Sequence, residues 1–300
     1  MAAPAVTVTE ADEQPRLGEA PGASAAVTFA FGDPRSELFA TARLGLTATG
    51  ASGLLMVFAG GEVAAVRAES ADPPSQDGGW EVVHAAGLRT TVEEPLGAWT
   101  LRGEAEDVEL DLRFRARSAP AQLEADRPAA RAGGLEGYEH LCAVEGVVAV
   151  GARRQELRCL GQRGHSWGAP DWEHLSLTRT LTAWMGEDCG LSLVAARPAK
   201  ARSHADELVD AMLWDGGPDA PATVVDEPRL STTYDAEGRM RRAGLELYVS
   251  PEDELARRAH GEVLCGTTVD LGRLRLDASF FGWEMDGREG VGRYDIVRRT

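Results

Sequence analysis

Hydrophobic and polar residues alternate with a period of two along much of the chain. In residues 108–114, apolar Val, Leu, Leu and Phe alternate with Glu, Asp and Arg. Residues 245–249 and 274–280 repeat this pattern. Such alternation places the apolar side chains on one face of a strand and the polar ones on the other. It predicts antiparallel sheets that bury one face.

Clusters of Asp and Gly separate these segments. The clusters at 77–79, 215–217 and 286–288 predict hairpin turns. No segment shows a long amphipathic helical pattern, and residues 203–213 fit either a helix or a strand that leads into a hairpin. Many short strands between turns predict an all-β fold, in which two tandem lipocalin-like domains form antiparallel barrels or sandwiches.

The composition of the chain changes at two places. Residues 1–24 are rich in Ala, Pro, Glu and Gly without periodicity, which predicts a disordered tail. Residues 118–134 are rich in Ala, Pro and Arg and predict a linker or long loop. We therefore expect one β domain at 25–135 and a second at 136–300. The strands expected at 138–150 fit with either domain.

Acidic residues outnumber basic ones along the chain. The 48 Asp and Glu residues against 31 Lys and Arg residues give a net charge of −17. A chain of this charge repels phosphate backbones, so we expect no nucleic-acid partner. The longest apolar run, residues 54–59, is too short to span a bilayer. The N-terminal residues lack the apolar segment of a signal peptide, and we expect a cytoplasmic protein with no membrane span.

The cysteines and histidines lack the spacing of metal sites. The cysteines form no CxxC pair, which predicts reduced thiols and no zinc site; they are Cys142, Cys159, Cys189 and Cys265. No HxxxH pair occurs among His165, His174 and His204. Lys200, the one lysine, is not placed for Schiff-base chemistry. We expect neither a metal nor a cofactor.

The most unusual stretch is residues 161–172, with the sequence GQRGHSWGAPDW. It holds three glycines, one histidine, one aspartate and two of the chain's seven tryptophans. We expect a glycine-rich turn between two strands, because glycine permits backbone angles that other residues resist. His165 and Trp167 are two residues apart and share a face when the chain is extended.

Residues 161–172 and four other segments resemble one known family. They are the HSWG sequence at 165–168 with Asp171 and Trp172 after it, residues 138–140 and 144–146, residues 95–99, and the stretch from Trp283 to Gly292. The chain resembles the lipocalin-like hydroxyneurosporene synthase (carotenoid hydratase) family and its two-domain, tocopherol cyclase-like relatives. The resemblance extends diffusely over residues 90–300.

This resemblance implies two tandem β-barrel-like domains around an apolar cavity. Hydratases of the family add water to an isoprenoid double bond, and cyclase-like members close rings. Both need a protonated acid beside an alkene and aromatic faces that stabilise a carbocation. The family's hydratases also use a Tyr-x-Asp pair on a following strand, which residues 190–194 lack. Glu187, Asp188 or Asp171 would then supply the carboxylate.

The resemblance and the residue chemistry together define the candidate site. His165 matches the motif histidine and is the candidate proton donor, or it braces the turn. Asp171 orients His165, or it caps a turn or pairs with Arg163. Arg163 and Arg179 are expected as surface or rim charges. The candidate residues that line the cavity, or alternatively pack the core, are Trp167, Trp172, Trp99 and Trp283.

Two classes of function follow. The first is a cofactor-independent enzyme that hydrates, cyclises or isomerises an apolar isoprenoid or polyketide-like molecule by acid–base chemistry. The second is a carrier or binding protein for such a molecule, without chemistry. The fold serves both. A carboxylate close to His165 favours the enzyme, whereas a hydrogen-bonded histidine remote from solvent, in a purely apolar cavity, favours the carrier.

Overall fold

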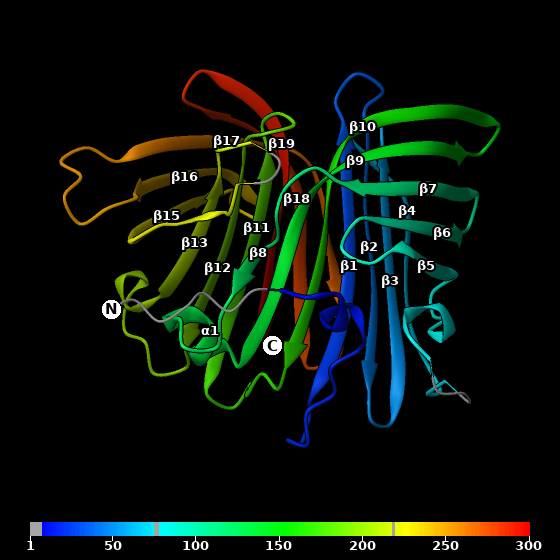
Figure 1. Ribbon diagram of the computed structural model, residues 1–300, viewed down its shortest axis with the longest axis horizontal. Helices are drawn as coiled ribbons and strands as arrows, with labels where there is room; N and C mark the ends of the chain where they lie inside the picture. Colours follow the sequence, from blue (N-terminus) through cyan, green and yellow to red (C-terminus); the bar gives the residue numbers. More distant parts are fainter. Residues whose placement is uncertain (1–7, 75–77, 218–219) are drawn as a thin grey trace.

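Two curled antiparallel sheets make up the protein (Figure 1). The computed structural model describes residues 8–74, 78–217 and 220–300. Its longest helix is α1 (Pro128–Gly133), of 6 residues, so the all-β expectation is confirmed. Each sheet bends into a half-barrel, and we call the sheet that begins with β1 the first half-barrel and the other the second half-barrel.

The first half-barrel has ten strands, in the order β4-β3-β2-β1-β10-β9-β7-β6-β5, with β8 paired to β9. The strands are β1 (Ser24–Asp33), β2 (Leu38–Thr47), β3 (Gly50–Ala59), β4 (Glu62–Ala71), β5 (Leu88–Glu94), β6 (Ala98–Ala105), β7 (Val108–Ala116), β8 (Ala121–Leu123), β9 (Leu135–Val150) and β10 (Arg153–Gly168). The 3₁₀ turns η1 (Glu10–Glu13) and η2 (Trp80–Val82) lie outside the sheet.

The second half-barrel has nine strands, in the order β14-β13-β12-β11-β19-β18-β17-β16-β15. They are β11 (Leu175–Trp184), β12 (Gly190–Pro198), β13 (Leu208–Trp214), β14 (Thr223–Val224), β15 (Glu227–Tyr234), β16 (Met240–Tyr248), β17 (Arg257–Asp270), β18 (Leu274–Met285) and β19 (Arg288–Arg299). The 3₁₀ turn η3 (His204–Asp206) lies between β12 and β13.

The alternating segments form strands, as the pattern predicts. In β7, buried and exposed residues alternate through most of the strand. The hairpin expected at 286–288 joins β18 to β19, and Asp286 and Gly287 have φ angles of 53° and 73°. Two positive φ angles in a two-residue loop are typical of a type I′ turn, whose twist matches that of the strands.

The sheets divide the chain after Gly168, not at the predicted boundary between 135 and 136. β9 pairs with β7, and β10 pairs with β1, so both strands complete the first half-barrel. The break in alternation at 118–134 is therefore a crossover within one sheet. It is not a bare linker, because β8 pairs with β9 and α1 contacts β12 and β13 of the other sheet.

The predicted disordered tail is also wrong for residues 8–24. Val8 and Ala23 are buried, and Asp12 and Glu13 in η1 are only 7% and 2% exposed. A segment without apolar periodicity can still dock when its buried carboxylate is paired. Residues 1–7 lie outside the described residues.

The two half-barrels pack against each other through their outer faces. A cluster of aromatic and aliphatic side chains fills this contact, including Phe39, Phe280 and Trp184. Polar residues add a second contact around Glu139 on β9. Its Oε2 atom accepts hydrogen bonds from Thr182 Oγ1 at 2.7 Å and Ser192 Oγ at 2.6 Å. One carboxylate therefore ties β9 to the second half-barrel.

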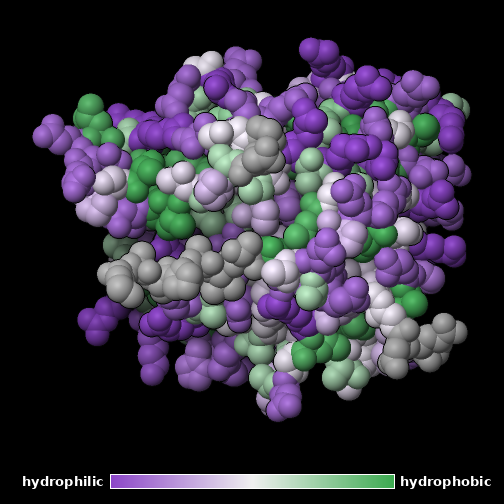
Figure 2. Space-filling model, viewed as in Figure 1, coloured by the Kyte–Doolittle hydropathy of each residue, from purple (hydrophilic) through white to green (hydrophobic). Residues whose placement is uncertain are grey.

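The surface seen in Figure 2 is mostly hydrophilic, with scattered hydrophobic residues. Single exposed apolar side chains are ordinary on proteins. Among the described residues, no helix combines the length and apolar character needed to cross a membrane.

Candidate functional site

The residues of the HSWG sequence lie on β10, at the centre of the first half-barrel. β10 pairs with β9 so that His165 is opposite Tyr138 and Arg163 is opposite His140. These four side chains are buried. The predicted glycine-rich turn is therefore a strand up to Gly168. The expectation that His165 and Trp167 share a face is met, because the extended chain alternates its side chains.

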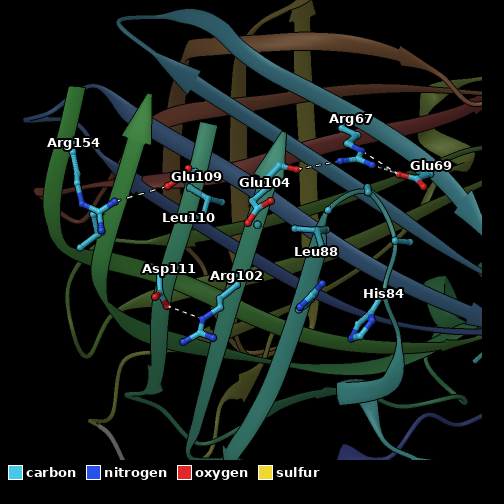
Figure 3. Close-up of a pocket in the computed structure, with 16 residues that line it drawn as sticks. Arg67, Glu69, His84, Leu88, Arg102, Glu104, Glu109, Leu110, Asp111 and Arg154 are labelled. Atoms are coloured by element: carbon cyan, nitrogen blue, oxygen red, sulfur yellow. Dashed lines mark hydrogen bonds and ion pairs between the residues drawn. The ribbon is translucent and has the colours of Figure 1, made fainter. Parts of the chain in front are cut away.

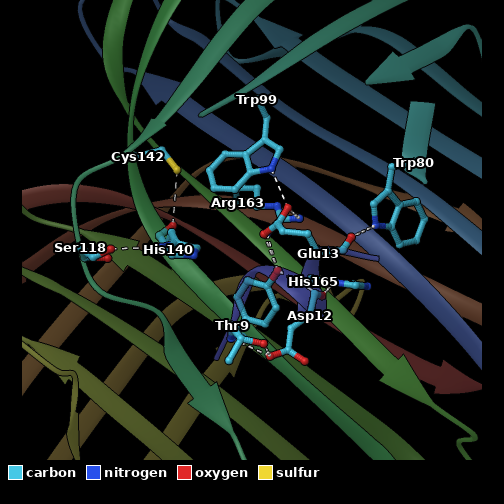
Figure 4. Close-up of polar contacts among 11 residues, drawn as sticks. Thr9, Asp12, Glu13, Trp80, Trp99, Ser118, His140, Cys142, Arg163 and His165 are labelled. Carbon is cyan, nitrogen blue, oxygen red and sulfur yellow. Dashed lines mark hydrogen bonds and ion pairs between the residues drawn. The ribbon is translucent and has the colours of Figure 1, made fainter. Parts of the chain in front are cut away.

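Glu13 of η1 is at the centre of this cluster (Figure 4). Its carboxylate accepts two hydrogen bonds from Arg163, with Nη1 to Oε1 at 2.8 Å and Nη2 to Oε2 at 2.9 Å. Trp99 Nε1 donates to Oε2 at 2.8 Å, and the Tyr138 hydroxyl donates to Oε1 at 2.6 Å. Arg163 is 0% exposed and Glu13 2% exposed. This is a bidentate ion pair that is closed to water.

Two neutral histidines flank the ion pair. His165 Nδ1 lies 2.8 Å from the Asp12 carbonyl oxygen, and His140 Nδ1 lies 3.1 Å from that of Ser118. A carbonyl oxygen only accepts, so each Nδ1 carries the proton and each Nε2 presents a lone pair. Burial, and next the charge of Arg163, lowers the pKa of each histidine to about 3. Neither Nε2 atom has a partner among the described residues.

Aromatic rings enclose the cluster. Trp80 Nε1 donates to the Glu13 carbonyl oxygen at 2.9 Å, and its ring packs edge-on against His165 with centroids 5.2 Å apart. Trp167 is half-buried and lies 5.3 Å from the His165 ring. The guanidinium of Arg16 covers Trp167 at 4.6 Å, a cation–π contact.

The structure brings together His165, Trp167 and Trp99 but not the other predicted site residues. Asp171 is 60% exposed and pairs with His174 at 2.7 Å, so the backbone of Asp12 orients His165 instead. Trp172 follows in the same loop, where its carbonyl oxygen accepts from Arg299. Trp283 is a core residue of the second half-barrel, stacked on Phe281.

The alternative carboxylates are also distant from the cluster. Glu187 pairs with Arg117 and Asp188 with Arg288. Both acids lie in the exposed loop between β11 and β12 and have side-chain exposures of 67% and 53%. Neither is therefore the carboxylate that the predicted acid–base chemistry needs beside His165.

Sequence reasoning missed the carboxylate and its main partner. Arg163 and Arg179 are not rim charges, since they are 0% and 3% exposed. Glu13 was placed in the tail because its partners are Trp99, Tyr138 and Arg163, more than 80 residues away in each case.

The second half-barrel contains a related cluster around Glu207. Arg179 Nε donates to Glu207 Oε1 at 2.7 Å, and Arg197 Nη2 donates to Oε2 at 3.2 Å. Arg179 Nη1 also donates to Tyr294 and Thr232, at 2.7 Å and 2.9 Å. Each half-barrel therefore buries an Arg–Glu pair beside a tyrosine.

A repeated turn delivers both glutamates. Residues 9–13 read TEADE and residues 203–207 read SHADE. In each, the aspartate side chain accepts from the first residue's backbone N–H, Thr9 to Asp12 at 2.7 Å and Ser203 to Asp206 at 2.9 Å. This bond is half of a capping box, which fixes the turn so that the next residue, glutamate, points into a half-barrel. The repeat was visible in the sequence and is the signal that identifies Glu13.

Other features of the described residues carry less chemistry. No group of three or more His, Cys, Asp or Glu residues there could hold a metal ion. A surface hollow of about 540 Å³ lies away from the cluster, beside β4 to β7 (Figure 3). Its walls carry exposed ion pairs, such as Arg67 with Glu69 and Arg102 with Asp111. Exposed ion pairs of this kind contribute little to the free energy of unfolding.

The fold and the site define a class: an all-β protein of two tandem lipocalin-like domains with a buried ion pair inside each half-barrel. The family model for a domain of unknown function, DUF7064, matches residues 9–299, and the chain belongs to that family. No curated protein matches it.

Solved structures share the fold at low sequence identity. An AttH candidate from Nitrosomonas europaea has a TM-score of 0.71 and 13% identity, covering 99% of both chains. Kievitone hydratase from Nectria haematococca has a TM-score of 0.67 and 12% identity, covering 98% of this chain and 94% of its own. CghA in complex with Sch210972 has a TM-score of 0.64 and 14% identity, covering 93% and 89%.

Proposed function

We propose that this protein is a cofactor-independent enzyme that hydrates, cyclises or isomerises an apolar isoprenoid or polyketide-like molecule in the first half-barrel. The observation that carries the proposal is the Tyr138 hydroxyl, which lies between a buried guanidinium and a buried carboxylate inside a ring of indoles. Kievitone hydratase is a hydratase by name, and CghA binds Sch210972. Their similarity in fold supports small-molecule chemistry on this scaffold.

Tyr138 is the proton donor of the proposed reaction. Burial raises the pKa of its phenol, so the group is protonated near neutral pH. Its proton becomes available to a substrate once the hydrogen bond to Glu13 Oε1 is released. Arg163 Nη1 donates to the phenol oxygen at 2.9 Å and stabilises the phenolate as it forms. Stabilising charge that develops in a water-free site is the larger part of such catalysis.

His165 acts as the base in this proposal, a change from the proton donor expected from the sequence. With a pKa lowered to about 3, the ring holds no spare proton near neutral pH. Its Nε2 lone pair accepts a proton from an attacking water or from a substrate carbon. Trp99 and Trp167 each have one face covered by a guanidinium, that of Arg163 and of Arg16 respectively, and their other faces stabilise the carbocation between these two steps.

A solvent-isotope experiment tests the proposal. Hydration, and cyclisation or isomerisation that begins with protonation of an alkene, all transfer a proton to carbon, so each incorporates deuterium when run in D₂O. The ligand is first identified by native mass spectrometry of protein from its own cells. Protein is then incubated with an apolar extract of those cells, and mass spectrometry follows deuterium incorporation. Tyr138→Phe should lower incorporation about a hundredfold or more.

Tyr294→Phe is the matched control, because it removes the equivalent hydroxyl of the second half-barrel. It should leave incorporation unchanged. Wild-type incorporation by the Tyr138→Phe variant would contradict the assignment of the acid.

A carrier without chemistry is the second candidate function. The observation that favours it is His165 itself, which is hydrogen-bonded, 1% exposed and remote from solvent. A carrier would co-purify with an apolar molecule and incorporate no deuterium into it.

We also propose a cytoplasmic location. Among the described residues all four cysteines are free, which fits a reducing compartment. Fractionation of source cells tests this.

A further inference from the structure

The walls of the first half-barrel form a carboxylate-binding site. Four donors converge on two oxygens: both Nη atoms of Arg163, the Trp99 indole N–H and the Tyr138 hydroxyl, all within 2.9 Å. They come from β10, β6 and β9, so the sheet alone positions them. The planar fork of arginine matches the two oxygens of a carboxylate.

The carboxylate that fills this site belongs to a segment outside the sheet. Residues 14–23 separate Glu13 from β1. Within residues 9–22 only Asp12 and Glu13 are buried. The segment thus contacts the interior mainly through one acidic side chain and two backbone carbonyl groups, which accept from Trp80 and His165. Its attachment uses the same chemistry that would bind an acidic ligand.

Three buried polar atoms near this carboxylate have no hydrogen-bond partner among the described residues. They are Arg163 Nε, His140 Nε2 and His165 Nε2, on side chains 0%, 1% and 1% exposed. Buried polar atoms are nearly always paired in folded proteins. One donor and two acceptors therefore remain for a ligand that replaces the segment. Aromatic rings adjoin these atoms, because Trp80 and Trp167 pack against His165 and Trp99 lies beneath the Arg163 guanidinium.

We infer that Glu13 occupies the place of a ligand's acidic group. The ligand class is an apolar, conjugated or ring-containing small molecule with a carboxylate, whose carboxylate displaces Glu13 from Arg163. The segment at residues 8–23 is then a tethered competitor for the same site. The inference rests on the proposed function in one respect, since both place the ligand in the first half-barrel.

The test measures binding in the full chain, without any turnover. The probes are all-trans-retinoic acid and its methyl ester, which share a conjugated isoprenoid body and differ in charge. Both absorb where tryptophan emits, so quenching of tryptophan fluorescence reports their binding. Glu13→Ala removes the competitor and keeps the four donors. A tethered group acts at an effective concentration of about millimolar, so its loss should tighten acid binding about tenfold or more.

The controls distinguish removal of the competing carboxylate from a nonspecific effect of destabilisation on binding. The methyl ester should gain less than about twofold in the Glu13→Ala variant, because it cannot pair with Arg163. Glu207→Ala, the equivalent change in the second half-barrel, should leave retinoic acid binding unchanged. Equal gains for acid and ester, no gain at all, or the same gain in Glu207→Ala would each overturn the inference.

A second measurement uses the wild-type protein in case the variant folds poorly. Arg16 is exposed and lies in the competing segment, so trypsin cleavage after it reports displacement. Retinoic acid should accelerate this cleavage relative to cleavage after Arg131, which is also exposed, and the ester should not. An unchanged rate at saturating acid would overturn the inference. Deuterium incorporation tests the proposed function separately, so either can fail alone.

Discussion

The two half-barrels contain the same buried Arg–Glu arrangement but connect it to the sheet differently. Each receives a glutamate from a Ser/Thr-x-Ala-Asp-Glu turn and pairs it with a buried arginine and a tyrosine. In the second half-barrel, β13 begins at Leu208, directly after Glu207, and Arg179 bonds Glu207, Tyr294 and Thr232. In the first, residues 14–23 lie between Glu13 and the nearest strand of its own chain segment.

The two clusters also differ in the number of buried polar side-chain atoms that have no hydrogen-bond partner. Among the described residues, the Glu207 cluster leaves one buried side-chain atom without a partner, Arg197 Nε, whereas the Glu13 cluster leaves three, on Arg163, His140 and His165. A network with few unpaired atoms holds a fold together. An unsaturated one of the same design is the arrangement expected of a binding site. The Glu207 cluster is thus a structural clamp. The Glu13 cluster differs from it in the number of buried polar atoms that have no partner.

The largest effect should come from removing the two glutamates in turn. Glu207→Ala leaves Arg179 buried under a turn that is held by strands, which should cost about 3–5 kcal/mol. Glu13→Ala should cost about 1–2 kcal/mol, roughly the loss of its hydrogen bonds, because water can reach Arg163 once the segment leaves. Urea unfolding, followed by hydrogen exchange in β10 and β11, measures both. Equal losses would remove the contrast between clamp and site.

Acid should weaken the first half-barrel before the second. The pKa of His140 and of His165 is about 3 in the folded protein and close to 6.5 when unfolded. Below about pH 6.5 the unfolded chain binds protons that the folded chain does not, so stability falls as pH falls. The two groups together should cost about 2.5 kcal/mol between pH 7 and pH 5.5.

The measurement is urea unfolding at both pH values. His165→Gln should remove about half of the difference. A pH response unaffected by His165→Gln would show that other groups cause it.

The smallest effect should come from the aromatic rim. Trp167→Phe weakens the contact with Arg16, and a half-exposed cation–π pair is worth about 0.5–1 kcal/mol. Thermal unfolding checks this, with trypsin cleavage after Arg16 as a local readout that should rise slightly. A loss as large as that of Glu13→Ala would mean that Trp167, rather than Glu13, anchors the segment.

Much of the fold was predictable from the alternation of residues. The strand at 108–114 follows it closely, because one buried face dictates a period of two. Residues 274–280 also form a strand, but both of its faces are buried from Leu276 onward. The same rule put His165 and Trp167 on one face. The glycines at 161 and 164 do not mark a turn, since both lie in a strand. At Gly161 the Ala30 carbonyl oxygen leaves no room for a side chain, and Gly164 packs against the side chains of Gln162 and Glu139. Close packing, not a turn, explains them.

The carboxylate partner was harder to find. Periodicity reports only burial of apolar faces, and Glu13 is an acidic residue buried by a single ion pair across 150 positions. Nothing local distinguishes it from solvated acids such as Glu10. The repeat of TEADE at SHADE does distinguish it, because two copies of one capped turn in an otherwise strand-rich chain indicate one structural task performed twice.

The alternation of side chains along β9 determines how the protein can be changed. Its even-numbered residues, including Tyr138, His140 and Val144, face the first interior, and its odd-numbered Glu139 and Leu141 contact the second half-barrel. Deleting one residue from β9 would exchange the two sets. Substitutions confined to even positions, in contrast, can retune the first interior while the contact between the sheets stays intact. The two faces of β9 can therefore be changed independently, by evolution or by design.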